Sequence, residues 1–147
     1  MAIRDFRREY RFLSNFYGCA SEYEGLKYPS TEHAFQAAKT SDIEERKKII
    51  SFASPFEAKR VGQTVKLRSD WEEVKYDIML ELVRQKFQYP ELKKMLLDTG
   101  TSDLIEENTW HDNFFGICLC EKCKAVGKNN LGLILQQVRS ELKTENC

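Results

Sequence analysis

The chain lacks an excess of charge of either sign, because 23 basic residues balance 23 acidic residues over 147 positions. A protein that coats nucleic acid needs a large positive field, so this class of function is disfavoured, although a local basic pocket for one phosphate group stays open. Long apolar runs are also missing: none approaches the roughly 18 residues that a membrane-spanning helix requires. The N-terminus carries charges but no apolar segment of the secretory type. We therefore expect a cytoplasmic protein without a membrane partner.

Glycine and proline are few, at 7 and 3 residues, and the chain contains no Gly/Ser-rich linker, repeat or low-complexity tract. Its length suits one domain, residues 1–147, that can bury about two thirds of its unfolded surface. Hydrophobic residues make up 41% of the chain, and 9 Phe, 6 Tyr and 2 Trp indicate a packed core rather than disorder.

Capping signals and turn residues predict the secondary structure. Serine side chains accept bonds from first-turn amides, so Ser30, Ser41 and Ser54 open three predicted helices, while Glu24 and Gly25 predict the turn of a hairpin. We expect helices over 30–39, 41–52, 54–62, 69–87, 90–100 and 130–143, short strands and turns over 1–29, and strands over 103–105 and 114–119. The sum is a predominantly helical α+β fold with a small β element.

Cysteine is concentrated in one segment. The five cysteines are Cys19, Cys118, Cys120, Cys123 and Cys147. An odd number in a chain without a secretory signal favours reduced thiols. The thiols of Cys118, Cys120 and Cys123 could alternatively hold a structural zinc ion, with Cys19 or His111 as the fourth ligand. A second cysteine pair at standard spacing is absent, so the sequence favours plain thiols and no cofactor.

The predicted helix over 30–39 carries polar groups on one face. Glu32, Gln36 and Lys39 are four and then three residues apart, and this spacing places an acid, an amide and an amine in line on an Ala-rich helix. Such a set suits acid–base chemistry or polar binding. The alternative is a solvated stripe, which is the more frequent outcome for a pattern of this kind.

A second amine lies on the predicted helix over 69–87. Lys75 follows Trp71 by one helical turn and precedes Met79 by another, so it lies beside an aromatic and in line with an apolar side chain. Desolvation there would favour the uncharged amine, which could act as base or nucleophile. Equally, the lysine could cover the core with its stem and keep its ammonium in water.

Two loop segments offer further polar groups. Over 108–116, Asp112 could accept from a sugar hydroxyl or hold a water molecule, but it could equally close an Asx turn. Lys59 and Arg60, together with the segment 127–130 ahead of the last predicted helix, could donate to a phosphate, because a helix N-terminus favours anions.

The N-terminal part of the chain also mixes aromatic and polar side chains. Arg11, Ser14 and Asn15 alternate with Phe12, Phe16 and Tyr17. Arginine can clamp a phosphate in bidentate fashion, and an aromatic ring can stack on a base. The alternative is a buried N-terminal strand with an arginine at the surface.

Six spaced motifs together resemble one known family. They are FLSNFY (12–17), YPSTEHAFQAAK (28–39), SPFEAKRVGQ (54–63), WEEVKYDIM (71–79), NTWHDNFFG (108–116) and GKNNLG (127–132). In this order they resemble the NADAR (NAD and ADP-ribose) family, typified by YbiA-like N-glycosidases, and the likeness runs from about residue 6 to residue 142. The resemblance implies a NADAR/YbiA-like fold and an N-glycosyl hydrolase.

The resemblance also implies the substrate class. It points to the N-ribosyl bond of an ADP-ribosylated guanine base or of phosphorylated riboflavin-pathway intermediates, so the partner is an ADP-ribosyl or ribose-phosphate substrate, in one branch attached to a nucleic acid base. The resemblance supports a lysine Schiff base, with Lys75 as the amine and Lys39 as its rival, while Glu32 and Asp112 position water and move protons. The alternative is a non-catalytic module that binds ADP-ribose or another NAD-derived nucleotide.

The expected substrate contacts follow from the same resemblance and from the residue types. They are Arg11, Ser14, Asn15, Phe16, Gln36, Trp71, Glu106, Phe115 and Asn130. Glu106 matches an acid that the family has a few residues before the aspartate. Phe115 stands where the family typically has tryptophan, so stacking is retained, whereas a hydrogen bond from an indole N–H is lost.

Overall fold

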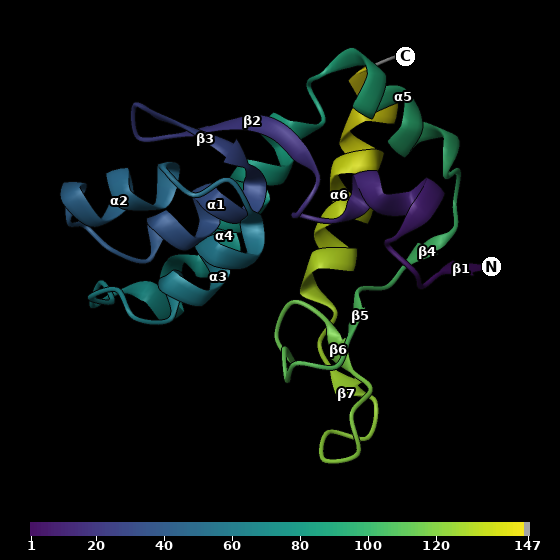
Figure 1. The fold of residues 1–147 in the computed structure, drawn as a ribbon. Helices are drawn as coiled ribbons and strands as arrows, with labels where there is room; N and C mark the ends of the chain where they lie inside the picture. The colour runs from purple at the N-terminus through teal and green to yellow at the C-terminus, as the bar shows by residue number, and fades with distance from the viewer. Residues whose placement is uncertain (146–147) are drawn as a thin grey trace. The chain divides into compact units, whose positions relative to one another are not determined.

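The computed structural model describes residues 1–145, so Cys147 lies outside the described part of the chain. The chain forms two compact units: the internal unit comprises Asn15–Lys86, and the terminal unit comprises Met1–Ser14 together with the chain from Phe87 onward. Helices and short strands occur in both units (Figure 1), which confirms the predicted α+β class. The prediction of a single domain over residues 1–147 stays a prediction.

The internal unit begins with the predicted hairpin. Strands β2 (Gly18–Tyr23) and β3 (Leu26–Ser30) pair antiparallel, with an irregular register between Gly18 and Ser21. Glu24 and Gly25 connect the strands and both have positive φ, at 46° and 86°. A two-residue turn with this backbone matches the twist of the flanking strands, and the expected hairpin is therefore confirmed.

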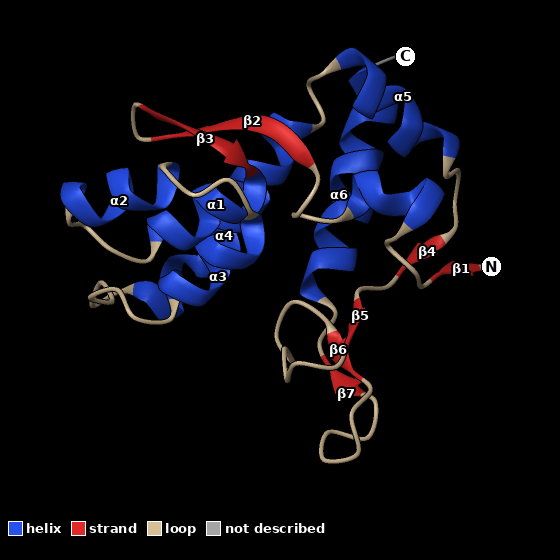
Figure 2. Ribbon diagram, viewed as in Figure 1, coloured by secondary structure: helices blue, strands red, loops and turns tan. Residues whose placement is uncertain are grey.

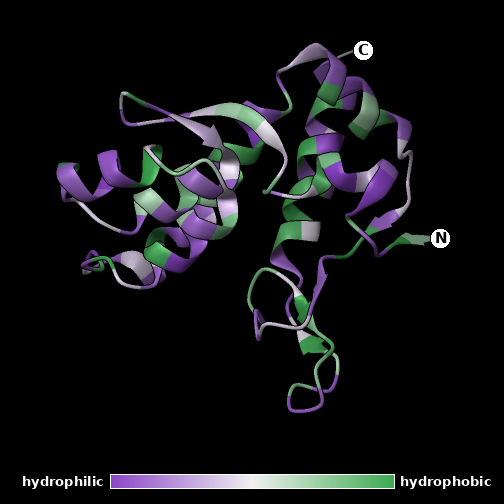
Figure 3. Cartoon of the chain, in the orientation of Figure 1, coloured by the Kyte–Doolittle hydropathy of each residue, from purple (hydrophilic) through white to green (hydrophobic). Residues whose placement is uncertain are grey.

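One buried helix forms the centre of the internal unit. Its four helices are α1 (Thr31–Ala38), α2 (Ile43–Ile50), α3 (Pro55–Gly62) and α4 (Trp71–Lys86). Every residue of α1 is buried, and this helix contacts both strands of the hairpin and the three other helices. By contrast, α2 buries only Arg46 and Ile49, and most of it has the hydrophilic colour in Figure 3. Polar side chains on α1 are therefore held in the interior.

Side-chain caps begin the first three helices. The hydroxyl of Ser30 accepts from the amide of His33, and that of Ser54 accepts from the amide of Phe56, as predicted. The prediction that Ser41 opens α2 is wrong, because Asp42 caps this helix. One carboxylate oxygen of Asp42 accepts from two successive first-turn amides, and this satisfies more orphan donors than a serine hydroxyl would.

The terminal unit is built from both ends of the chain. Its elements are β1 (Ala2–Ile3), the 3₁₀ helix η1 (Arg8–Leu13), α5 (Pro90–Asp98), β4 (Asp103–Leu104), β5 (Glu107–Asn108), β6 (Ile117–Cys118), β7 (Val126–Gly127) and α6 (Asn130–Glu145). Strand β1 pairs parallel with β4, and the other three form a small sheet in the order β5-β6-β7. Figure 2 shows these strands as short pieces between long loops.

Two predictions for the terminal unit need correction. The expected strand over 114–119 is reduced to the two residues of β6, because the loop before it is folded on its own side-chain bonds. The segment 8–13 is a 3₁₀ helix rather than a strand, and it buries Phe12 and Leu13. None of the helices within residues 1–145 is long and apolar enough to span a membrane.

Candidate functional site

The acid and the amide predicted on the first helix are joined inside the internal unit. Glu32 and Gln36 are buried, with exposed fractions of 7% and 5%, so the alternative of a solvated stripe is wrong for these two residues. Gln36 Nε2 donates to Glu32 Oε1 over 2.8 Å. Lys39, the third member, is half-buried at the C-cap of α1, and its carbonyl accepts from the amide of Arg68 over 2.7 Å.

A glycine on the neighbouring helix makes room for this amide. A Cβ atom at Gly62 of α3 would lie 2.0 Å from Gln36 Oε1 and 2.9 Å from Gln36 Cβ. A carboxylate can only accept, so Gln36 must turn its NH₂ group to Glu32. Its buried Oε1 then has no hydrogen-bond partner among the described residues. The sequence indicated Gly62 only as a helix stop and gave no sign of this second role.

Asn15 ties the first turn of α1 to α4. Its backbone carbonyl accepts from the backbone amide of Glu32 over 3.0 Å, and its side-chain Nδ2 donates to the sulfur of Met79 over 3.4 Å. The side chain is 8% exposed. The backbone and the side chain of this buried residue therefore bond to two different helices and fix the backbone at Glu32. This is a structural role beside the predicted role in substrate binding.

His33 is a buried residue of this region that the sequence reasoning missed. Its Nδ1 lies 2.7 Å from Ser30 Oγ and its Nε2 lies 2.9 Å from the carbonyl oxygen of Phe52. Because a carbonyl only accepts, Nε2 carries the proton and Nδ1 accepts from the serine hydroxyl. Burial lowers the pKa of His33, although the Phe52 carbonyl raises it in part. The Glu32–His33 pair of neighbours therefore combines an acid with a neutral imidazole.

Helix α4 carries the predicted aromatic and amine. The Trp71 ring is buried against Phe35 of α1, with ring centroids 5.1 Å apart. The side chain of Lys75 is 15% exposed, and its Nζ lies 2.7 Å from Glu72 Oε1. Most of the Lys75 side chain is thus covered, while its amine pairs with the exposed Glu72. This is the geometry of a lysine whose stem covers the core and whose amine reaches the surface. A role for this amine in chemistry stays a prediction.

Phe16 lies in an aromatic pair with a cation nearby. Its ring meets that of Phe56 edge to face with centroids 4.7 Å apart, and Lys59 Nζ lies 6.0 Å from the Phe16 centroid. Phe56 is 71% exposed, an unusual state for a large apolar side chain. Phe16, Phe56 and Lys59 therefore place aromatic rings and a positive charge close together in the internal unit.

In the terminal unit, Asp112 closes an Asx turn. Its Oδ1 accepts from the amides of Phe114 and Phe115, over 3.1 Å and 2.9 Å. The buried Asn108 shapes the same loop, since its Oδ1 accepts from the amides of Trp110 and Asp112. This is the alternative that the sequence offered for Asp112, and its predicted catalytic role stays a prediction. Asn108 was missed because an asparagine in a loop gives no distinctive signal.

The other predicted residues of the terminal unit have structural contacts of their own. Arg11 is exposed on η1, Ser14 is the C-cap of η1, and Phe115 is buried. The amide of Glu106 donates to Asn129 Oδ1, and the amide of Asn130 donates to the carbonyl of Phe114. The backbone N–H of Asn130 at the start of α6 is therefore already hydrogen-bonded within the unit, so a phosphate contact from Asn130 would have to come from its side chain.

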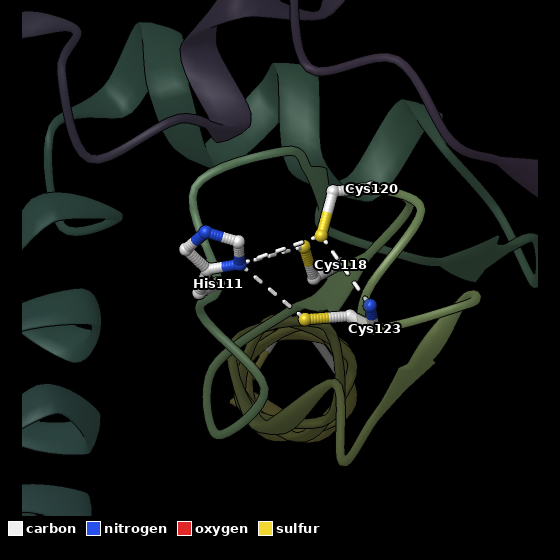
Figure 4. A group of neighbouring side chains, drawn as sticks. All are labelled: His111, Cys118, Cys120 and Cys123. Atoms are coloured by element: carbon white, nitrogen blue, oxygen red, sulfur yellow. Dashed lines mark hydrogen bonds between the residues drawn. The ribbon is translucent and has the colours of Figure 1, made fainter.

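Four side chains of the same loop region converge on one point. The Nδ1 atom of His111 and the Sγ atoms of Cys118, Cys120 and Cys123 all lie within 4.8 Å of one another (Figure 4). Of the two fourth ligands that the sequence left open, the structure places His111 in this group, whereas Cys19 belongs to strand β2 of the internal unit. Among residues 1–145 this is the group of His, Cys, Asp or Glu that could hold a metal ion.

Comparison with known proteins gives a consistent family. A family model described as the NADAR domain matches residues 4–143 and so spans parts of both units. The chain is similar to N-glycosidase YbiA of Escherichia coli, with 36% identity over 93% of this chain and 84% of that protein. It is also similar to an N-glycosidase of Nostoc punctiforme, with 36% identity over 86% of each chain.

Two further similarities extend the comparison. A riboflavin biosynthesis protein of Vibrio vulnificus is 35% identical over 90% of this chain, which corresponds to 35% of that longer protein. The solved NMR structure of Escherichia coli YbiA matches with a TM-score of 0.81 and 34% identity, over 99% of this chain and 86% of that one. The predicted resemblance, fold class and enzyme class of N-glycosyl hydrolase are thereby confirmed. The chain belongs to the NADAR domain family.

Proposed function

We propose that this enzyme hydrolyses the N-ribosyl bond of a phosphorylated intermediate of riboflavin biosynthesis. The observation that carries the proposal is the buried Glu32 carboxylate, held by Gln36 on α1. As the bond between C1 of ribose and the base nitrogen breaks, C1 gains positive charge. Glu32 becomes a carboxylate when it gives its proton to the departing base, and a carboxylate fixed in an apolar interior stabilises that charge strongly. Relatives named as N-glycosidases and as a riboflavin biosynthesis protein support this choice of substrate.

Glu32 acts as the acid–base group of the proposed reaction. In its protonated form it gives a proton to the departing base, and as a carboxylate it then accepts a proton from the attacking water. Gln36 positions Glu32 by donating to Oε1, and Asn15 fixes the backbone at the same residue. Both are positioning residues that act through the carboxylate.

The amine of Lys75 provides a covalent route. The uncharged Nζ attacks C1, the bond from C1 to the base nitrogen breaks, and the base leaves with the proton from Glu32. The ribose ring then opens to an iminium between C1 and Nζ, water adds to C1, and the amine departs with the sugar left as an aldehyde that recloses. Lys39, half-buried on α1, is the rival amine.

The substrate is held by stacking and by charge. The Phe16 and Phe56 rings, with Lys59 close to Phe16, suit a planar base next to a phosphate. The roles that the resemblance implies for residues of the terminal unit stay predictions: substrate binding for Arg11, Ser14, Glu106, Phe115 and Asn130, and catalysis for Asp112. ADP-ribosylated guanine is the alternative substrate, since the resemblance covers both branches of the family.

A panel of substrates tests the proposal. The purified protein is incubated separately with phosphorylated riboflavin intermediates, an oligonucleotide carrying ADP-ribosylated guanine, NAD and ADP-ribose, and the products are identified by mass spectrometry. We expect ribose 5-phosphate and free base from the riboflavin intermediates. Restored guanine with free ADP-ribose would assign the alternative substrate instead. Binding of ADP-ribose without any product would overturn the proposal and favour a binding module.

A further inference from the structure

His111, Cys118, Cys120 and Cys123 are arranged as ligands are arranged around a tetrahedral metal ion. Zinc lies about 2.3 Å from a thiolate sulfur and about 2.0 Å from an imidazole nitrogen, so tetrahedral geometry separates nitrogen from sulfur by about 3.6 Å. The observed distances from His111 Nδ1 to the three sulfurs are 3.3 Å for Cys120, 3.5 Å for Cys123 and 4.0 Å for Cys118. The group therefore has the dimensions of a preformed zinc site.

Hydrogen bonding does not account for this convergence. A neutral imidazole nitrogen has either one proton or one lone pair, so Nδ1 can form one good bond, yet three sulfur atoms surround it (Figure 4). The loop also holds His111 at a φ of 69°, a conformation that a non-glycine residue rarely adopts. A cation at the centre of the four atoms explains both the convergence and the strained backbone.

The surrounding donors favour negative charge on sulfur. The amide of Cys123 donates to Cys120 Sγ over 3.4 Å, and Asn113 Nδ2 donates to Cys123 Sγ over 3.7 Å. Both contacts place an N–H donor against sulfur and so favour a thiolate, which is the form of cysteine that binds zinc.

The segment that carries the ligands contains little regular secondary structure. Strands β5, β6 and β7 have two residues each, which is too short for a sheet to be stable by itself. The apolar side chains Trp110, Leu119 and Val126 are exposed at 51%, 47% and 60%, so they contribute little core. A metal ion is one means by which a segment with so few exposed-face contacts can be stabilised.

We propose that His111, Cys118, Cys120 and Cys123 bind one structural zinc ion that fastens the segment 108–127. Four protein ligands close the coordination sphere, so the ion leaves no open position for a substrate. The zinc ion instead stabilises the loop in which Asp112 and Phe115 are placed. This inference does not depend on the glycosidase activity or on its substrate.

Metal analysis and cobalt substitution test the zinc site. Protein purified without chelator under reducing conditions is expected to contain about one zinc ion per chain. Replacement by cobalt is expected to give the intense thiolate-to-cobalt absorption of a sulfur-rich tetrahedral site. Cys120→Ser, Cys123→Ser and His111→Asn should each lose the zinc and this absorption, whereas the matched control Cys19→Ser should keep both. Cys118 is not substituted, because it is fully buried and its replacement could unfold the protein. His111 is exposed and Cys120 and Cys123 are half-buried, so their substitution tests metal binding without disturbing the core.

Hydrogen exchange locates the effect. Removal of zinc should speed exchange of the amides of β6 and β7, for example that of Ile117, while amides of α1 in the same sample stay protected. Folded wild-type protein that takes up neither zinc nor cobalt would overturn the inference, as would Cys120→Ser protein that binds metal as well as the wild type. A mass lower by two hydrogens without metal would also overturn it and would identify a disulfide instead.

Discussion

At the scale of single residues, the buried polar groups of α1 carry the account. Glu32 is a buried acid that accepts a hydrogen bond from Gln36 on the next turn of the same helix. A buried acid is costly unless it is hydrogen-bonded, so the bond from Gln36 offsets part of this cost, and the burial of Glu32 supports the proposed function. Lys75, whose stem is covered and whose Nζ lies beside Glu72, is the corresponding amine on α4.

Reductive trapping tests the assignment of the amine. When borohydride is added during turnover, the proposed iminium should be reduced to a stable secondary amine, and peptide mass spectrometry should find the ribose phosphate on Lys75. Lys75→Ala should abolish the adduct, while Lys48→Ala on the exposed side of α2 serves as the matched control. An adduct on Lys39 would transfer the role to that residue, and turnover without any adduct would contradict the covalent route.

His33 predicts how stability depends on pH. Its folded pKa lies below the unfolded value of about 6.5, so the unfolded chain takes up the proton first as the pH falls. The free energy of unfolding should therefore decrease as the pH drops below about 6.5, until the folded pKa is also passed, and it should be unaffected by His33 above neutrality. The slope is measured by urea unfolding at several pH values.

The control for this prediction is His33→Gln. The variant should be less stable overall, because Ser30 and the Phe52 carbonyl lose their partner, but it should lack the part of the slope that His33 contributes. Equal slopes in wild type and variant would show that His33 does not titrate on unfolding.

At the scale of elements, the contact of α3 with α1 sets the geometry of the acid. Gly62→Ala would place a methyl group against Gln36, and because Gln36 is buried its side chain can move only at the expense of its bond to Glu32. We expect a loss of about 1–3 kcal/mol in the free energy of unfolding, together with a lower kcat. Gly18→Ala, where a Cβ would meet nothing within 4 Å, is the matched control.

Urea denaturation and steady-state kinetics measure both effects. The account predicts a lower urea midpoint and a lower kcat for Gly62→Ala, and values close to the wild type for Gly18→Ala. A Gly62→Ala protein that is as active as the wild type would mean that the position of Gln36 does not affect the chemistry.

The elements that local chemistry determines could be predicted from the sequence. Ser30, Ser54 and the Glu24–Gly25 turn each act within a few residues, and the structure confirms them. The cap of α2 was assigned one residue too early because Ser41 and Asp42 are both good caps, and only the geometry of the turn selects the aspartate. The 3₁₀ helix η1 has no clear local signal, since tertiary burial of Phe12 and Leu13 stabilises it.

The contacts of the candidate site were predicted less completely, because they join residues on different elements. Spacing placed Glu32 beside Gln36, but it could not show the approach of Gly62 or the bond from Asn15 to Met79. In the same way, the cysteine spacing left a metal site only as the alternative to plain thiols, and it could not show that His111, at a positive φ, lies next to the three sulfur atoms.

At the scale of the whole molecule, the family model covers parts of both compact units. The NADAR model spans residues 4–143, and the solved structure of Escherichia coli YbiA aligns with 99% of this chain. The internal unit contains Glu32, Gln36, Lys39 and Lys75, while the terminal unit contains the cysteine cluster. The proposed chemistry and the proposed metal site can therefore be tested by separate substitutions in one protein.

The measurement that tests the central claim most directly is the rate of base release by wild type and Glu32→Gln, followed on the best substrate of the panel. The glutamine side chain has the size of the glutamate side chain, and its oxygen can still accept from Gln36, but it cannot transfer a proton. The account predicts a loss of about a hundredfold to ten-thousandfold in kcat, with the fold intact. Glu44→Gln, an exposed acid at the start of α2, should retain the wild-type rate. A Glu32→Gln enzyme with the wild-type rate would contradict the claim that this carboxylate breaks the N-ribosyl bond.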